Sequence, residues 1–134
     1  MTQQGPVTAS EWAQLETAYG RLVGGGRDVV LVQAEAILAI EAIAASIAAP
    51  GVTALNVVTG PYGALFGQWL RRGGAEVVDQ ITGFDEVVTV EAVEAAIRDR
   101  RPDVLSIVHA EAATGGTNPI AEIAAIASEN GNLT

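Results

Sequence analysis

The chain has 134 residues, of which 49% are hydrophobic, and this length and composition suit one globular unit with a buried core. Sixteen acidic residues against seven basic ones give a net charge of -9, which disfavours nucleic acid and anionic membrane surfaces as partners. The sequence contains no cysteine, one histidine and no lysine, so we expect no disulfide and no transition-metal site. It shows neither a secretory signal nor a long uncharged apolar run, so we expect a soluble, cytoplasmic protein.

The N-terminal part of the sequence predicts an amphipathic helix and then a strand. Thr8 or Ser10 can cap a helix that continues to about Leu22, where a run of glycines ends it. Residues 28–33, DVVLVQ, are a short apolar, β-branched run that is typical of a central parallel strand.

From residue 34 onward, helix and strand patterns alternate. The first helix is apolar nearly all round, so we expect it to be buried. Thr89 is the expected N-cap of the third, while Asn118 caps the fourth with Pro119 at its first position. The predicted helices are residues 34–49, 62–74, 89–101 and 118–131, and the predicted strands are residues 53–58, 75–81 and 103–110.

This alternation predicts an α/β fold with a mostly parallel sheet and helices on both of its faces, a three-layer αβα arrangement. We expect residues 1–27 to form an N-terminal segment with an outer helix, and residues 28–134 to form part of a larger domain, because the next strand of the pattern would follow the last helix. Ligands of such sheets bind beyond the carboxyl ends of the strands.

The loop VHAEAATGGTNP, residues 108–119, is one candidate for such a site. His109 and Glu111 alternate along the strand end, and the small residues after them leave room for a flat cofactor or a small anion. The alternative is that His109 is a hydrogen-bonded core residue and that the glycines only turn the chain.

The segment TGPYGALFGQW, residues 59–69, places Tyr62 at the start of a helix, where its ring can stack on a heteroaromatic ligand. Phe66 and Trp69 follow at helical spacing and are expected in the core or in an interface.

The segment QAEAI, residues 33–37, lies where helix N-terminal amides often bind phosphate. It contains no glycine, and Glu35 would repel a nearby phosphate or simply cap the helix. Neither GxGxxG nor GxxxxGK[ST] occurs in the sequence, which excludes the usual dinucleotide and P-loop motifs.

Three segments in this order resemble the class V, fold type I aminotransferases that use pyridoxal phosphate, in particular the alanine/serine-glyoxylate group. They are AIEAIAASIAAPG, VVTGPYGALFGQWLRRGGAEV and VHAEAATGGTNPIAEIAAIASENG. The resemblance covers residue 28 to the end, and it implies that the chain is an incomplete part of the large cofactor-binding domain.

The resemblance also implies roles for individual residues. Tyr62 matches the aromatic residue that stacks on the pyridine ring, Ala112 stands where the family has a serine or threonine that touches the cofactor, and Glu111 matches the same loop. The phosphate-binding place is taken by Glu35, Ala36 and Ile37, and Gly5 and Pro6 match a segment near the substrate.

The function implied is amino transfer between a small amino acid and a 2-oxo acid such as glyoxylate or pyruvate. The family's aspartate and its Schiff-base lysine would follow Thr134 in the family pattern, so this chain has no catalytic residue of its own, and a further segment or a second chain would complete it. A homodimer of completed protomers is implied as well. Two alternatives remain: a non-catalytic binding or scaffold subunit on the same fold, and a free-standing flavodoxin-like or receiver-like domain.

Overall fold

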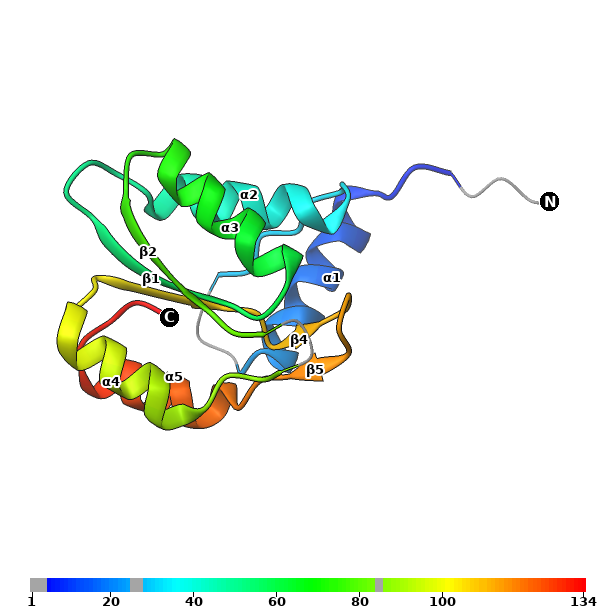
Figure 1. Ribbon diagram of the computed structural model, residues 1–134. Helices are drawn as coiled ribbons and strands as arrows, with labels where there is room; N and C mark the ends of the chain where they lie inside the picture. Colours follow the sequence, from blue (N-terminus) through cyan, green and yellow to red (C-terminus); the bar gives the residue numbers. More distant parts are fainter. Residues whose placement is uncertain (1–4, 25–27, 84–85) are drawn as a thin grey trace. The chain divides into compact units, whose positions relative to one another are not determined.

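A computed structural model describes residues 5–24, 28–83 and 86–134 of the chain (Figure 1). The chain forms two compact units, Met1–Glu35 and Ala36–Thr134. None of the helices in the described ranges is long and apolar enough to cross a membrane.

The first unit contains helix α1, Ala9–Leu22. Thr8 is its N-cap, as predicted, and completes a capping box with Glu11, in which each side chain bonds to the backbone of the other residue. The predicted strand at residues 28–33 was wrong, because these residues form no strand. A β-strand requires a neighbour for its backbone groups, and the described part of the chain pairs none with this segment.

The second unit contains a three-stranded parallel sheet in the order β2-β1-β3. The strands are β1, Thr53–Val58; β2, Glu76–Ile81; and β3, Val104–Ile107. All three predicted strands from residue 53 onward are therefore confirmed, although the third is shorter than predicted.

Helices cover both faces of this sheet, which confirms the three-layer αβα prediction (Figure 1). On one face, α2 and α3 pack around Trp69 and Leu70 of α3 and Ala54 of β1; on the other, α4 and α5 pack on Leu55 and Val57 of β1. The period-2 alternation of β1 explains this division between the two cores. The helices are α2, Ala36–Ile47; α3, Pro61–Arg72; α4, Val90–Arg100; and α5, Ile120–Glu129.

Helix α2 is less buried than predicted. Ala44 is its one buried residue, while Leu38, Ile40 and Ile43 are 51%, 41% and 55% exposed. The helix packs on α3 along one side, and part of its remaining apolar surface lines a cavity. An apolar composition all round thus predicted the helix but overestimated its burial within this chain.

The start of α5 also differs from prediction. Pro119, not Asn118, occupies its N-cap position. The Asn118 side chain instead accepts a hydrogen bond from the Val88 amide at 3.2 Å and donates to Thr59 Oγ1 and the Val108 carbonyl, at 2.9 and 2.7 Å. It is 3% exposed, so these bonds satisfy a buried amide that would otherwise be costly.

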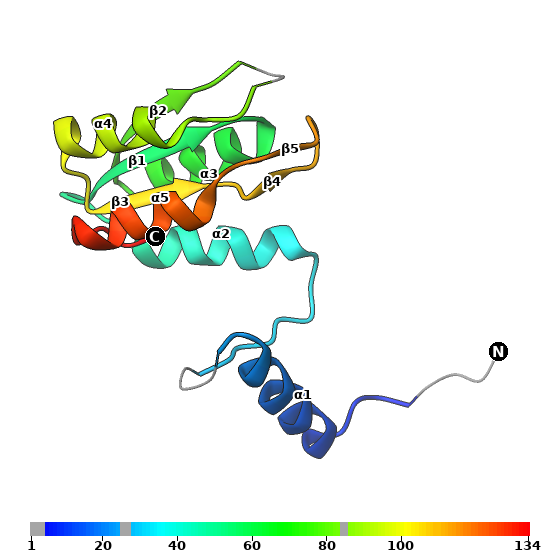
Figure 2. The same cartoon turned by 90° about the horizontal axis from the view of Figure 1, so that it is seen from below.

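A two-stranded antiparallel hairpin, which the sequence reading missed, lies beyond one end of the sheet (Figure 2). Its strands are β4, Ala110–Glu111, and β5, Gly116–Thr117, and Gly115 in the turn has φ 75°. The positive φ explains why glycine follows the run of small residues there.

The strand order creates a topological switch point at β1. The chain leaves β1 through α3 to reach β2 on one side, and then returns through α4 to β3 on the other side. Because α3, which follows β1, and α5, which follows β3 and the hairpin, lie on opposite faces, the loops after β1 and β3 diverge, which opens a crevice at the carboxyl ends of these strands.

Two buried residues of α3, Gly63 and Gly67, face β1 without a side chain, which lets the helix approach the strand closely. The amide of Asn56 donates to the Gly63 carbonyl at 3.1 Å, and a Cβ atom on Gly67 would overlap that amide. It would also lie 3.0 Å from Asp79 Oδ1.

We predict that Gly67→Ala destabilises the protein by about 1–3 kcal/mol, because the added methyl group overpacks the α3–β1 contact. In an open helix position the same change stabilises a protein by about 0.5–1 kcal/mol. The sign of the change in unfolding free energy therefore shows whether the position is tightly packed. Gly20→Ala in α1, where the nearest atom would be Val29 Cγ2 at 3.7 Å, is the matched control. Urea midpoints of the two variants are compared, and an equal effect would contradict this packing.

We also predict an acid-sensitive contact at the start of the sheet. Asp103 Oδ2 accepts hydrogen bonds from the Thr53 amide and hydroxyl at 2.8 and 2.9 Å, and these bonds hold the pKa of Asp103 below its ordinary value of 3.8. A lowered folded-state pKa stabilises the fold fully above the ordinary pKa, and this stabilisation is lost as the pH falls through the folded pKa.

Asp103→Asn should therefore lower Tm near neutral pH and weaken the fall of Tm on acidification, measured by thermal melts from about pH 6 to pH 2. Asp99→Asn is the control, because Asp99 is exposed and pairs with the neighbouring Arg100 on the surface. A parallel shift of the whole Tm profile would contradict the assignment.

Candidate cofactor site

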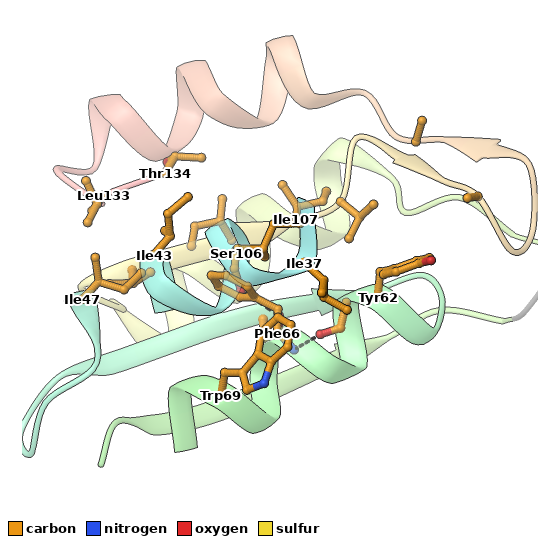
Figure 3. A pocket seen from close by; sticks show the side chains of 18 residues that line it. Ile37, Ile43, Ile47, Tyr62, Phe66, Trp69, Ser106, Ile107, Leu133 and Thr134 are labelled. Atoms are coloured by element: carbon orange, nitrogen blue, oxygen red, sulfur yellow. Dashed lines mark hydrogen bonds between the residues drawn. The ribbon is translucent and has the colours of Figure 1, made fainter. Parts of the chain in front are cut away.

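A largely apolar cavity of about 630 Å³ opens in the second unit between α2, α3 and β3 (Figure 3). Ile37 and Tyr62 lie toward one end of it, while Ile47, Leu133 and Thr134 lie toward the other (Figure 3). Its lining residues are Ile37, Ile40, Ile43, Ile47, Asn56, Tyr62, Gly63, Phe66, Trp69, Val104, Leu105, Ser106, Ile107, Val108, Ala110, Ala112, Leu133 and Thr134.

Tyr62 lies at the second position of α3, directly beyond the carboxyl end of β1. Pro61 begins the helix, where its missing N–H leaves no donor unsatisfied. The Tyr62 side chain is 49% exposed, so an aromatic face is available at the mouth of the cavity. A flat heteroaromatic ring could stack on it.

Small side chains from the hairpin and from the end of β3 form the neighbouring wall. Ala110 and Ala112 both line the cavity and point the same way, because they alternate around Glu111; Val108 precedes them. Three apolar residues of this loop thus line the cavity, and their predicted place beside a cofactor stays a prediction. Two further members of the expected core or interface set, Phe66 and Trp69, also line this cavity and meet edge to face at 6.5 Å.

Glu111 itself does not line the cavity. Its side chain is 1% exposed and fills the space in front of Gly60, where a Cβ atom would overlap it. Oε1 accepts a hydrogen bond from the Ala113 amide at 3.4 Å, and Oε2 has no partner among the described residues. Glu111 thus occupies the start of α3 beneath the wall, and its predicted contact with a cofactor stays a prediction.

His109 is exposed at a bend and does not line the cavity. The bend interrupts the alternation that was expected to place it on the same side as Glu111, and its exposure also contradicts a core histidine. What holds this position is the backbone, since the His109 carbonyl accepts from the Asn118 amide at 2.8 Å.

The remaining predicted site residues lie near or outside the boundary of the second unit. Ala36 is the first residue of α2 and Ile37 lines the cavity. Glu35, Gly5 and Pro6 belong to the first unit, and their predicted contacts with a cofactor and a substrate stay predictions. Among the described residues, no group of three or more histidine, aspartate or glutamate side chains could hold a metal ion.

The polar centre of the cavity was missed by the sequence reading. Asn56 and Ser106 line it and bond to each other, with Ser106 Oγ donating to Asn56 Oδ1 at 2.7 Å. The available signal was a single amide in the middle of the apolar strand TALNVV, because a buried polar residue requires several partners.

Three aminotransferases are similar to this chain in sequence or in structure. Pyridoxamine–pyruvate transaminase of Mesorhizobium japonicum is 32% identical over 104 residues, which are 76% of this chain and 26% of that protein. 2-Aminoethylphosphonate–pyruvate transaminase of Burkholderia pseudomallei is 29% identical, with 95% of this chain and 41% of that protein covered. The crystal structure of alanine–glyoxylate aminotransferase from Nostoc sp. superposes with a TM-score of 0.87 at 26% identity, over 97% of this chain and 36% of that one.

This chain is homologous to part of the class V aminotransferases. The resemblance drawn from the three sequence segments is thereby confirmed, as is the α/β fold of the pyridoxal-phosphate-dependent transferases. No protein-family profile matches the sequence. The chain spans about a quarter to two fifths of the length of the curated relatives that it matches.

These homologues indicate pyridoxal 5'-phosphate as the cofactor of the class V aminotransferases. The cavity fits the ring of this molecule, because Tyr62 offers an aromatic face beside a wall of small residues. The phosphate is fitted less well. No arginine lines the cavity within the described ranges, and the sequence contains no lysine.

We predict a strong coupling between Gly60 and Glu111. Gly60→Ala should destabilise the protein by about 1–3 kcal/mol, because its methyl group overlaps the Glu111 side chain. In a Glu111→Ala background the same change should cost less than about 1 kcal/mol, since the overlapping atoms are gone. A double-mutant cycle from urea denaturation measures the difference, and additive effects would contradict the contact.

Proposed function

We propose that this chain is part of a pyridoxal-phosphate-dependent aminotransferase that moves an amino group between a small amino acid and a 2-oxo acid such as pyruvate or glyoxylate. Pyruvate appears in the names of two relatives and glyoxylate in that of a structural neighbour, and all of these are aminotransferases. The observation that carries the proposal is the convergence of Ile37, Tyr62 and Ala112, from three separate segments, on one cavity, whose lining runs along β3 and continues into the loops beyond the carboxyl ends of β1 and β3.

The chain contributes binding and positioning in this proposal. Tyr62 presents its ring to one face of the ligand, while Val108, Ala110 and Ala112 form an apolar wall that excludes water. When bound, the cofactor supplies the electron-accepting ring that the exchange of amino groups requires.

Other parts of the site have to come from polypeptide outside these 134 residues. The sequence has no lysine, so a reactive amine is contributed elsewhere, as is the acidic partner of the pyridine nitrogen. The open edge of β3 supports a covering segment, because beyond Leu133, which pairs with Val104, no described strand continues along it. A homodimer of completed protomers belongs to the same proposal.

The activity is tested with the protein as its natural gene encodes it. Purified protein is incubated with pyruvate or glyoxylate and a panel of small amino donors, and formation of alanine or glycine is followed by chromatography. Transfer to either acceptor supports the proposal. A protein that stays colourless with added pyridoxal phosphate and transfers no amino group would support the scaffold alternative instead.

The ring-binding role of Tyr62 is tested by affinity. We predict that Tyr62→Ala weakens binding of pyridoxamine roughly threefold to tenfold, because a stacked aromatic pair contributes about 0.5–1.5 kcal/mol beyond its buried area. Tyr62→Phe keeps the ring face and should stay within about twofold of the native protein. Tyr19→Ala is the matched control, since Tyr19 in α1 is also 49% exposed. Equilibrium dialysis gives the constants, and equal losses in both alanine variants would contradict stacking.

A further inference from the structure

One buried carboxylate supports the Tyr62 end of the cavity without lining it. Glu111 is 1% exposed, and a Cβ atom on Gly60 would overlap its Cγ, Cδ and Oε2 atoms. The Glu111 side chain therefore rests directly on the backbone of Gly60. Gly60 is the N-cap residue of α3 and lies two residues before Tyr62.

Hydrogen bonding does not explain why the Glu111 side chain occupies this place. Oε1 accepts a long bond of 3.4 Å from the Ala113 amide in its own turn, and Oε2 has no partner among the described residues. An unpartnered polar atom is costly to bury, so packing on Gly60 and the positive end of the α3 dipole have to offset this cost. Packing depends on the length of the side chain, and the dipole interaction depends on its charge.

The segment that carries Glu111 also carries part of the cavity wall. Ala110 and Ala112, on either side of Glu111, line the cavity. Successive residues of an extended strand point to opposite faces, so one face of this segment forms the wall while the other rests on the turn that leads into α3.

The base of the hairpin is fixed separately. The backbone amide of Asn118 donates to the His109 carbonyl at 2.8 Å, and its side chain donates to the Val108 carbonyl at 2.7 Å. Both bonds precede the wall residues. Within residues 110–117, all of which the structure describes, Glu111 is the buried residue. The position of the hairpin relative to α3 therefore depends on the contact of Glu111 with Gly60.

We propose that Glu111 is a positioning residue of the cofactor site: its side chain is a spacer between the hairpin and the start of α3, and its length sets the distance between the alanine wall and the Tyr62 ring. The proposal rests on the proposed function, which supplies the ring that contacts both. Dispersion attraction between two atoms falls by about a quarter to a half when a gap of about 0.5–1 Å opens, so a small shift of the wall weakens ring binding.

The test separates side-chain length from charge, with the protein as its natural gene encodes it. Glu111→Asp keeps the charge and removes one methylene group, so it should weaken pyridoxamine binding about threefold to tenfold, as loss of a stacked pair does. Glu111→Gln keeps the length and the bond from the Ala113 amide. It should lower the urea midpoint, because the dipole interaction is lost, and still bind pyridoxamine within about twofold of the native protein. Glu122→Asp, at an exposed position on α5, is the control and should change neither quantity.

A double-mutant cycle distinguishes positioning from a general structural role. In a Tyr62→Ala background, Glu111→Asp should weaken binding by less than about twofold more, because the ring that it positions is absent. Adding Gly60→Ala to Glu111→Asp returns one carbon atom to the same contact and should recover most of the lost affinity. Equilibrium dialysis with pyridoxamine gives the constants, and urea midpoints show that each variant is folded.

Equal losses of affinity in Glu111→Asp and Glu111→Gln would overturn the proposal, and so would a full further loss in the Tyr62→Ala background. If Glu111→Asp alone does not fold, its pair with Gly60→Ala and the Glu111→Gln variant decide, and a loss beyond about twofold in Glu111→Gln overturns the spacer role. Length-dependent pyridoxamine binding by a protein that transfers no amino group would reject the proposed function alone. Amino transfer by a native protein whose Glu111→Asp variant binds pyridoxamine equally well would reject the spacer role alone.

Discussion

The side-chain amide of Asn56 joins all three strands of the sheet to the first turn of α3. It donates to Asp79 of β2 at 2.8 Å and to the Gly63 carbonyl at 3.1 Å, and it accepts from Ser106 of β3 at 2.7 Å. Since the residue is 1% exposed, every lost partner would leave a buried polar group unsatisfied. The position of Tyr62, one residue before Gly63, is therefore set by the centre of the sheet and not by the loop that carries it.

A second buried amide holds the other side of the crevice. Asn118 bonds to Thr59 after β1, to Val108 after β3 and to Val88 before α4, so one side chain connects the ends of two strands whose following loops diverge. The wall that contains Val108 and the hairpin is thereby fixed relative to β1. Rigid supports of this kind are what a binding site needs if its geometry is to persist without a ligand.

Local sequence patterns predicted most of the helices and strands, because the residues that make up each pattern are the ones that stabilise the element. The apolar, β-branched run at residues 53–58 marks a strand buried on both faces, and Thr89 marks a helix start because its hydroxyl accepts from the Ala92 amide. The wrong predictions share a different cause, because the structure at those residues depends on partners far away in the sequence. Residues 28–33 have the composition of a strand, but no strand among the described residues pairs with them. Asn118 is a residue type common at N-caps, but its side chain bonds to three other segments instead.

The candidate site was predictable to the same extent. Tyr62 and Ala112 could be placed on one rim because parallel strands bring their following loops together, and both do line the cavity. That the Glu111 side chain would turn away to fill the start of α3 could not be predicted, because it depends on the absence of a side chain at Gly60, far away in sequence. The hairpin likewise depends on a pairing across Gly115 that alternation alone does not reveal.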